Sequence, residues 1–312
     1  MLKKLEVQSL RADLGAVEGL LADRTPETDP IGFLQLSQRQ TTLLARLATV
    51  ESAVEYKAAV GLFFAGGPVI GSRGIDASFA AKAVGLFQDM VSKQFAMEEV
   101  GDLGRRGPVA MQPNSDLIVT NVIRGSVGLL LEEAGVSEAF ADTQLKVVVD
   151  HVVDTVMATA APAADEFEQA LERMDPRFLT SLGEFFEVMD ERSAVLRLVE
   201  SEREVELNAD AIRRGRERAG AATILDSEEE EMIGRIFILP AARRFELRVL
   251  QEGTTLVGGI ARAFSQPELE RVVSAENVVG ELWRVRIKTR TVTRPTRPPK
   301  VTYTLVGLVA PV

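Results

Sequence analysis

The spacing of apolar residues changes along the chain, and this change constrains the fold more than any other feature. Toward the C-terminus, Phe245, Leu247 and Val249 alternate with charged residues, which is the period of a strand with one buried face. Near the N-terminus, apolar residues instead lie alternately three and four positions apart, as in the seam of a short coiled coil: Val7, Leu10, Leu14, Val17 and Leu21. Because helices and strands occupy different parts of the chain, we predict the α+β class.

Residues 1–56 are predicted to form a helical hairpin. The first helix ends before Pro26, and a second helical stretch follows the turn at residues 25–30. The first helix holds about two heptads, fewer than an independent coiled coil needs. The hairpin is therefore expected to pack on the rest of the molecule, or to pair with a protein partner or a second copy of the chain.

Residues 57–225 are predicted to form an α+β body. Its first half is a ββαββ layer with one amphipathic helix, which Asp76 can cap. The predicted strands of this layer are residues 58–64, 69–75, 117–123 and 127–131. The second half is predicted to be helical over residues 137–160, 165–174 and 178–189. Residues 193–207 fit a strand or a helix equally, and a short helix is expected to start at Asn208 or Asp210.

Residues 226–312 are predicted to form a separate small antiparallel β-barrel of the SH3-like or OB-like kind. The acidic run at residues 226–231 is expected to be a linker or a negative arm. One short helix is expected at residues 267–275. The expected strands are residues 232–239, 244–250, 255–263, 281–293 and 301–309.

Two residue counts exclude many chemistries. The chain has no Cys, so disulfides, thiolate zinc sites, iron–sulfur clusters and Cys nucleophiles are excluded. The single His, His151, is the only residue on which a His-based catalytic site could be built. Its helical phase places it on a polar flank, which favours a solvated surface position. No phosphate-loop fingerprint or nucleophile elbow is present, and we expect no cofactor.

The charge of the chain is divided unevenly. The net charge is −10, yet residues 234–312 hold 13 basic residues against 6 acidic ones, a balance of +7. The remainder holds 23 basic residues against 40 acidic ones, a balance of −17. A basic terminal module on an acidic body points to a polyanionic partner for that module.

Most of this positive charge falls in one segment without a single acidic residue. If the segment is extended, Arg284 and Arg286 share a face with Lys288 and Arg290, while Trp283 and its apolar neighbours face the core. The proline-rich loop that follows would project its charge outward. We therefore predict a polyanion site or nucleic-acid site made by Arg284, Arg286, Lys288, Arg290, Arg294, Arg297 and Lys300.

Two other interpretations of these cations remain open. Lys, Arg and Pro on an edge strand block edge-to-edge pairing, and the 28 Arg against 8 Lys suggest the amino-acid bias of a high-GC bacterial genome. The basic module could also dock on acidic residues of the same chain, including Glu228 to Glu231. Exposed aromatic residues, which single-strand binders use for stacking, are not expected on the barrel because Trp283 has the phase of a core residue.

Two weaker candidates lie in the body. Its loops could bring together an anion-binding group made of Arg105, Arg106, Arg124 and Ser126. A carboxylate group for a divalent cation could form on one helix from Glu184, Glu187, Asp190 and Glu191, although an ordinary solvated face is the more common outcome.

The sequence thus leads to a set of functional expectations. The first residues are broken by charges and form no export signal, so we expect a cytoplasmic protein without membrane association. We expect a non-enzymatic scaffold or regulator whose basic barrel engages nucleic acid or another acidic partner. One alternative is a carboxylate-dependent and divalent-metal-dependent enzyme acting on a phosphorylated or nucleic-acid substrate. Another is an interaction module whose barrel docks on its own acidic body.

Overall fold

The structure, a computed structural model, describes residues 2–71, 73–101, 103–104, 106–123, 127–135, 140–250, 253–261, 263–275 and 279–312. It mixes helices and strands and confirms the α+β class. The chain divides into two compact units. Unit 1 comprises Met1–Ala163 and Thr180–Arg216, and unit 2 comprises Ala164–Leu179 and Glu217–Val312.

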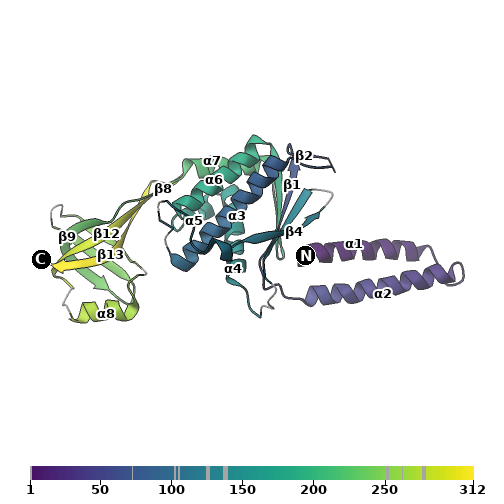
Figure 1. Cartoon of the computed structure of the whole chain (residues 1–312), viewed down its shortest axis with the longest axis horizontal. Helices are drawn as coiled ribbons and strands as arrows, with labels where there is room; N and C mark the ends of the chain where they lie inside the picture. Colours follow the sequence, from purple (N-terminus) through teal and green to yellow (C-terminus); the bar gives the residue numbers. More distant parts are fainter. Residues whose placement is uncertain are drawn as a thin grey trace. The chain divides into compact units, whose positions relative to one another are not determined.

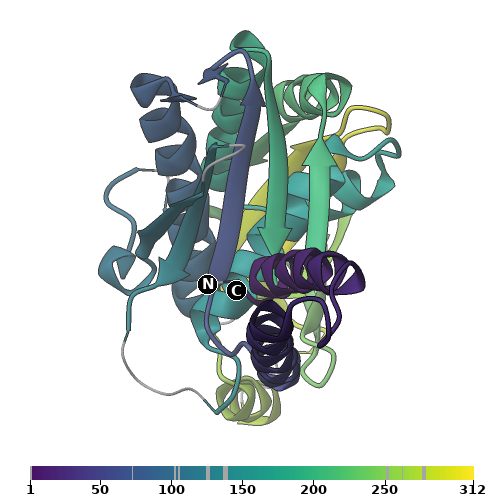
Figure 2. The same ribbon diagram turned by 90° about the vertical axis from the view of Figure 1, so that its right-hand side faces the viewer.

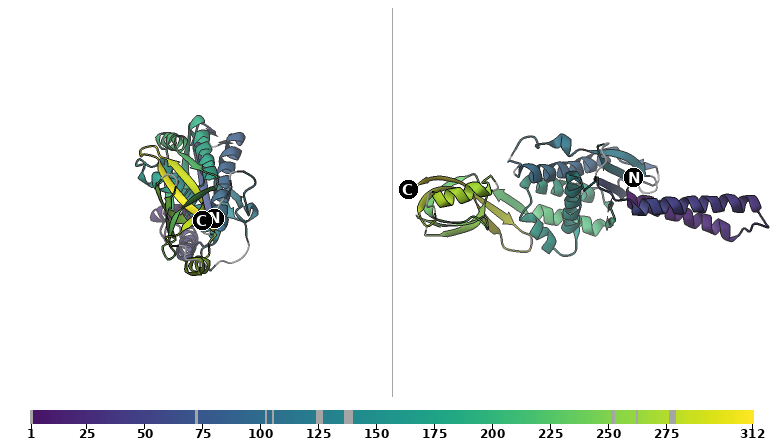
Figure 3. Two further views of the ribbon diagram at one scale, coloured as in Figure 1. Left: turned by 90° about the vertical axis from the view of Figure 1, so that its left-hand side faces the viewer. Right: turned by 90° about the horizontal axis from the view of Figure 1, so that it is seen from below.

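The N-terminal hairpin consists of α1 (Lys3–Ala22) and α2 (Pro30–Ser52), which lie side by side in Figures 1 and 3. Asp29 begins α2 because its carboxylate accepts a hydrogen bond from the Gly32 amide at 2.9 Å, and Pro30 occupies the first turn. Leu10 and Val17 of α1 are buried, as the seam spacing predicts, whereas α2 has no buried residue. The predicted hairpin is confirmed.

Unit 1 is built on one antiparallel sheet in the order β4-β5-β1-β6-β7. Its strands are β1 (Ala59–Gly66), β4 (Leu117–Ile123), β5 (Val127–Glu133), β6 (Ala194–Glu200) and β7 (Arg203–Leu207). The segment with two possible interpretations, residues 193–207, is thus the hairpin β6–β7. The strand expected at 69–75 is replaced by β2 (Val69–Ile70) and β3 (Gly74–Ile75), which pair only with each other because the chain turns back at Gly71, with φ of 53°.

Helices cover one face of this sheet, as Figure 2 shows behind the strands. They are α3 (Ala77–Val100), α4 (Gln144–Ala160), α6 (Pro176–Glu191) and α7 (Ala209–Ala221), and a short 3-10 helix, Gln112–Asn114, precedes β4. Phe64 of β1 meets Phe79 of α3 edge to face, with ring centroids 5.4 Å apart. On the opposite face, Leu2 at the start of α1 packs with Phe63 and Leu130 in a smaller buried cluster. No helix in the described ranges has the length and apolar character needed to cross a membrane.

Unit 2 contains a closed five-stranded barrel, visible in green and yellow in Figure 3. Its strands are β9 (Glu230–Leu239), β10 (Arg244–Val249), β11 (Thr255–Ile260), β12 (Leu282–Thr293) and β13 (Lys300–Pro311). The barrel closes because β13 pairs with both β11 and β12. Gly258 allows this closure, since a Cβ atom there would lie 2.0 Å from the carbonyl oxygen of Tyr303.

Three further elements complete unit 2. The strand β8 (Thr223–Asp226) extends the sheet beyond β12, and α8 (Gln266–Ala275) lies near the expected helix. The acidic run at 226–231, which we expected to be a linker or a negative arm, ends β8 and begins β9 beside the basic strand β12. The helix α5 (Asp165–Leu171), which we assigned to the body, falls in the same unit as the barrel.

Candidate functional site

The strand β12 presents its residues as the alternation predicted. Trp283, Val285 and Ile287 are buried in the apolar core of the barrel. Arg284 and Arg286 point away from that core, and their side chains are 47% and 48% exposed. Arg284 and Arg286 are therefore on the outside of the barrel, whereas the alternation does not continue to Arg290, whose side chain is only 20% exposed, or to Val292, which is buried.

The cations of β12 meet acidic side chains of the neighbouring strands. Arg286 lies 2.9 Å from Glu229, and Arg290 lies 3.6 Å from Asp226. Arg284 is 4.0 Å from Glu231, and Lys288 is not free either. Because the pairs of Arg284 and Arg286 are half exposed, each holds its cation only weakly.

A second group of cations surrounds the acidic helix α5. The carboxylate of Glu168, 1% exposed, accepts hydrogen bonds from the Thr296 amide at 2.9 Å and from the Thr296 hydroxyl at 2.5 Å. Its other oxygen forms an ion pair with Arg297 Nε at 3.1 Å. Burial raises the pKa of this carboxyl, but the hydrogen bonds of Thr296 and the charges of Arg297 and Arg294 lower it more, so the pKa lies below its ordinary value.

The remaining contacts extend along the same side of α5. Glu172 lies 2.6 Å from Lys300 Nζ and 3.7 Å from Arg294 Nη1, and Asp165 pairs with Arg297. We call Asp165, Glu168 and the C-cap residue Glu172 the acidic face of α5. We call Arg294, Thr296, Arg297 and Lys300 the basic tip, because they lie at the turn between β12 and β13. The acidic face follows an i, i+3, i+7 spacing, which places all three carboxylates on one side of a helix.

Each predicted cation of the barrel thus has a partner in the structure. Six of the seven contact carboxylates of the same unit, at Asp165, Glu168, Glu172, Asp226, Glu229 and Glu231. Sequence reasoning named the acidic run at 228–231 as a docking partner. It missed α5, because nothing in the local pattern of residues 165–172 shows that they lie beside residues 294–300.

The other predicted groups do not form a comparable site. Arg105, Arg124 and Ser126 lie outside the described residues, and Arg106 is an exposed loop residue. His151 is exposed, as its phase predicted, and lies 3.3 Å from a carboxylate oxygen of Glu98. Among the described residues, no three His, Asp or Glu side chains converge to hold a metal ion, the group Glu184, Glu187, Asp190 and Glu191 included.

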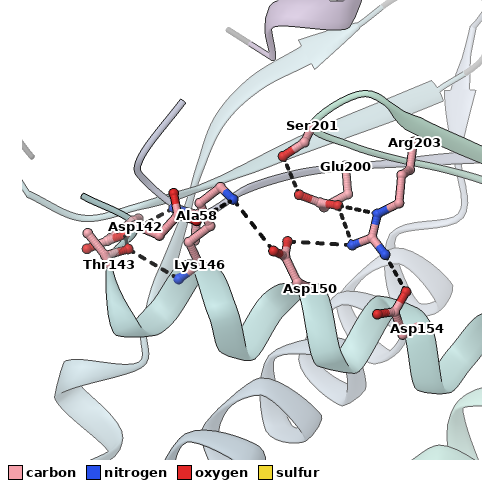
Figure 4. A network of polar contacts seen from close by, with 10 residues as sticks. Ala58, Asp142, Thr143, Lys146, Asp150, Asp154, Glu200, Ser201 and Arg203 are labelled. Atoms are coloured by element: carbon pink, nitrogen blue, oxygen red, sulfur yellow. Dashed lines mark hydrogen bonds and ion pairs between the residues drawn. The ribbon is translucent and has the colours of Figure 1, made fainter. Parts of the chain in front are cut away.

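Unit 1 holds a carboxylate network that the sequence did not reveal. Figure 4 shows Asp150 of α4 beside Glu200 at the end of β6. Arg203 forms ion pairs with both of them and with Asp154. The buried Glu200 accepts from Arg203 Nε at 2.8 Å, and Lys146 Nζ lies 3.5 Å from Asp150. These residues come together only because α4 crosses the end of the hairpin β6–β7.

Asp150 and Glu200 titrate as one coupled pair. Burial raises the pKa of Asp150 to about 6, and the hydrogen bond and charge of Glu200 act in the same direction. Burial also raises the pKa of Glu200, but hydrogen bonds from Asp150, Ser201 and Arg203 lower it more, and the net change is downward. Below about pH 6 the charge of the pair therefore resides on Glu200, beside Arg203, and the proton resides on Asp150.

A pocket of about 430 Å³ lies where α2 ends and β1 begins. Its lining includes Glu55, Glu132 and Glu133. Glu133 already accepts hydrogen bonds from the Ala58 amide at 3.1 Å and the Thr143 hydroxyl at 2.6 Å, and Glu55 accepts from the backbone amide at position 3. The carboxylates that line the pocket are thus engaged in holding unit 1 together.

A Ser–Lys pair lies between α3 and α6. Lys93 Nζ is 2.5 Å from Ser181 Oγ, and Asp89 accepts from both. Ser181 is 2% exposed, so a substrate cannot reach its hydroxyl in this arrangement. The group joins two helices across the core and provides no accessible nucleophile.

No family model, curated protein or solved structure matches this chain. A function can therefore be argued only from the side chains described above. Among them, the cations of β12 and the basic tip share one chemistry, since their ion pairs described above are all with carboxylates of the same unit.

Proposed function

We propose that this chain is a non-enzymatic cytoplasmic scaffold or regulator whose barrel engages an acidic protein segment through β12 and the basic tip. The observation that carries the proposal is the set of carboxylates already held by these cations, from Glu229 on one side to Glu168 on the other. Guanidinium groups and a backbone amide converge on carboxylate oxygens, which is how proteins recognise acidic side chains.

The same contacts favour a protein partner over nucleic acid. A nucleic-acid surface needs cations spaced along a phosphate backbone, and single-strand binders add exposed aromatic rings for stacking. Trp283 is 4% exposed and belongs to the barrel core. The pairs at Arg284 and Arg286 are half exposed, so a partner carboxylate can replace Glu231 or Glu229 at small cost.

The N-terminal hairpin provides a second, independent observation in support of a scaffold role. Large apolar side chains are exposed on it: Leu20, Ile31, Leu34 and Leu44. Two helices alone do not bury these side chains, and apolar side chains gathered on a surface are typical of protein contacts. We assign the hairpin to binding a protein partner or a second copy of the chain.

Binding of labelled Glu-rich peptide and labelled duplex DNA of matched charge to the full chain tests the proposal. We expect the peptide to bind more tightly than the DNA at the same salt concentration. Substituting Arg284→Ser and Arg286→Ser should weaken peptide binding about tenfold, as expected when two charge-assisted contacts are lost. The matched control is Arg244→Ser with Arg271→Ser, two exposed cations of the same unit outside β12.

Tighter binding of DNA than of peptide would contradict the proposal, and so would the absence of peptide binding. An equal loss in the control variant would also contradict it, because attraction would then depend on total charge and not on β12.

A further inference from the structure

We infer that the basic tip is a recognition site for an acidic helix with carboxylates at i, i+3 and i+7, and that α5 is its occupant within the chain. This inference rests on the proposed function and names the kind of segment that the barrel engages. A partner helix with the same spacing of carboxylates would take the place of the acidic face of α5.

The centre of the site is built for one carboxylate. Glu168 is almost fully buried: one carboxylate oxygen accepts hydrogen bonds from the amide and hydroxyl of Thr296, and the other forms an ion pair with Arg297 Nε at 3.1 Å without a hydrogen bond. The backbone amide is a fixed donor because Pro295 and Pro298 restrict the turn on both sides of Thr296. A turn that is ordered before binding loses little entropy when a ligand arrives.

The flanking contacts set the spacing. Arg297 reaches both Asp165 and Glu168, three residues apart, while Arg294 and Lys300 both reach Glu172, four residues further along. An extended segment would place these carboxylates on different sides and too far apart. The tip therefore distinguishes a helix from an extended acidic segment.

The occupant is held by contacts that another helix can replace. Phe167 and Leu171 of α5 are fully buried and anchor the helix, so a competing helix would replace only the charge and hydrogen-bond contacts of the tip. The flanking pairs are partly exposed, with Asp165 at 64% and Arg297 at 46%. In addition, α5 has only 7 residues, and Ala164 at its N-terminus offers no side-chain cap.

A labelled peptide of residues 163–176 tests the inference when it is titrated into the full chain. In the wild-type chain the acidic face of α5 competes with the peptide. In a variant with Asp165→Asn, Glu168→Gln and Glu172→Gln the tip has lost its three carboxylate partners, and we expect the peptide to bind about tenfold more tightly or better. Adding Arg294→Ser, Arg297→Ser and Lys300→Ser to that variant should abolish the gain.

A second chain variant and a changed peptide complete the experiment. Where circular dichroism shows that the triple variant has not folded, Glu172→Gln alone frees Arg294 and Lys300 at a partly exposed position, and a gain of a few fold is expected. A peptide with Glu168 replaced by Gln should bind less tightly than the unchanged peptide.

Equal affinity of the peptide for wild-type and variant chains would overturn the inference, as would binding that survives the tip substitutions. These results are distinguishable from failure of the proposed function, because the substitutions Arg284→Ser and Arg286→Ser change β12 alone, whereas the substitutions at Arg294, Arg297 and Lys300 change the tip alone. Loss at β12 with retained binding at the tip would reject the broader proposal and leave the helix site standing.

Discussion

At Glu168, burial and hydrogen bonding have opposite effects on one carboxyl group. The carboxylate has lost nearly all contact with water, yet its pKa is lowered because Thr296 and Arg297 stabilise the charged form. A group whose pKa is lower in the folded chain than in the unfolded chain stabilises the fold above its unfolded pKa. That stabilisation is lost as the pH falls through the folded value.

Glu168→Gln is accordingly expected to lower the free energy of unfolding at pH 7 by about 1–2 kcal/mol, since it removes a charge-assisted contact but keeps the shape. The difference between variant and wild type should shrink as the pH falls below the ordinary pKa of a glutamate, because the wild-type carboxyl then takes up a proton. Urea unfolding of both proteins from pH 7 to acidic pH measures this difference in the free energy of unfolding. A difference that stays constant with pH would show that the charge of Glu168 contributes nothing.

Ionisation of Asp150 has the opposite effect on the stability of the fold. Its pKa of about 6 in the folded chain lies above the ordinary value, so the protonated form favours the fold and ionisation weakens it as the pH rises. We expect the wild type to lose about 1 kcal/mol of stability relative to Asp150→Asn between pH 5 and pH 8, after allowance for partial exposure. Thermal melts of the wild type and the variant at pH 5 and pH 8 measure this. The same difference in stability between the two proteins at both pH values would contradict the prediction.

Among the elements, the hairpin and the barrel strands could be predicted because their signals are local. The 3-4 spacing from Val7 to Leu21 specifies a helix, and the alternation around Trp283 specifies a strand and the outward direction of its cations. No local sequence pattern indicates which elements these helices and strands will pair with. β1 pairs with β5 and β6, which lie far along the chain, and the short turn at Gly71 keeps β2 and β3 apart from it.

The closure of the barrel provides a test at the level of the element. Gly258→Ala places a methyl group against the carbonyl oxygen of Tyr303, so β11 and β13 must separate, and we expect a loss of about 2 kcal/mol or more. Gly259→Ala is the matched control, because nothing lies within 4 Å of its added Cβ atom. Chemical unfolding followed by Trp283 fluorescence reports on the barrel. Equal effects of the two substitutions would refute the role assigned to Gly258.

For the whole molecule, the charge division found in the sequence has a structural counterpart inside unit 2. The positive balance of residues 234–312 is offset by acids of β8, β9 and α5, which lie outside that range or at its edge in the sequence. Cation positions could be predicted because β-strand alternation is local. The identity of their partners could not, since the contact between Glu168 and Thr296 joins residues 128 positions apart.

The central claim is that the barrel recognises carboxylates and not phosphates. Competition measures this most directly: labelled peptide of residues 163–176 is bound to the chain with a neutralised acidic face, and unlabelled peptide or duplex DNA of matched charge is added. We expect unlabelled peptide to displace the label and DNA to do so only weakly at physiological salt. Displacement by DNA at equal or lower concentration would contradict it.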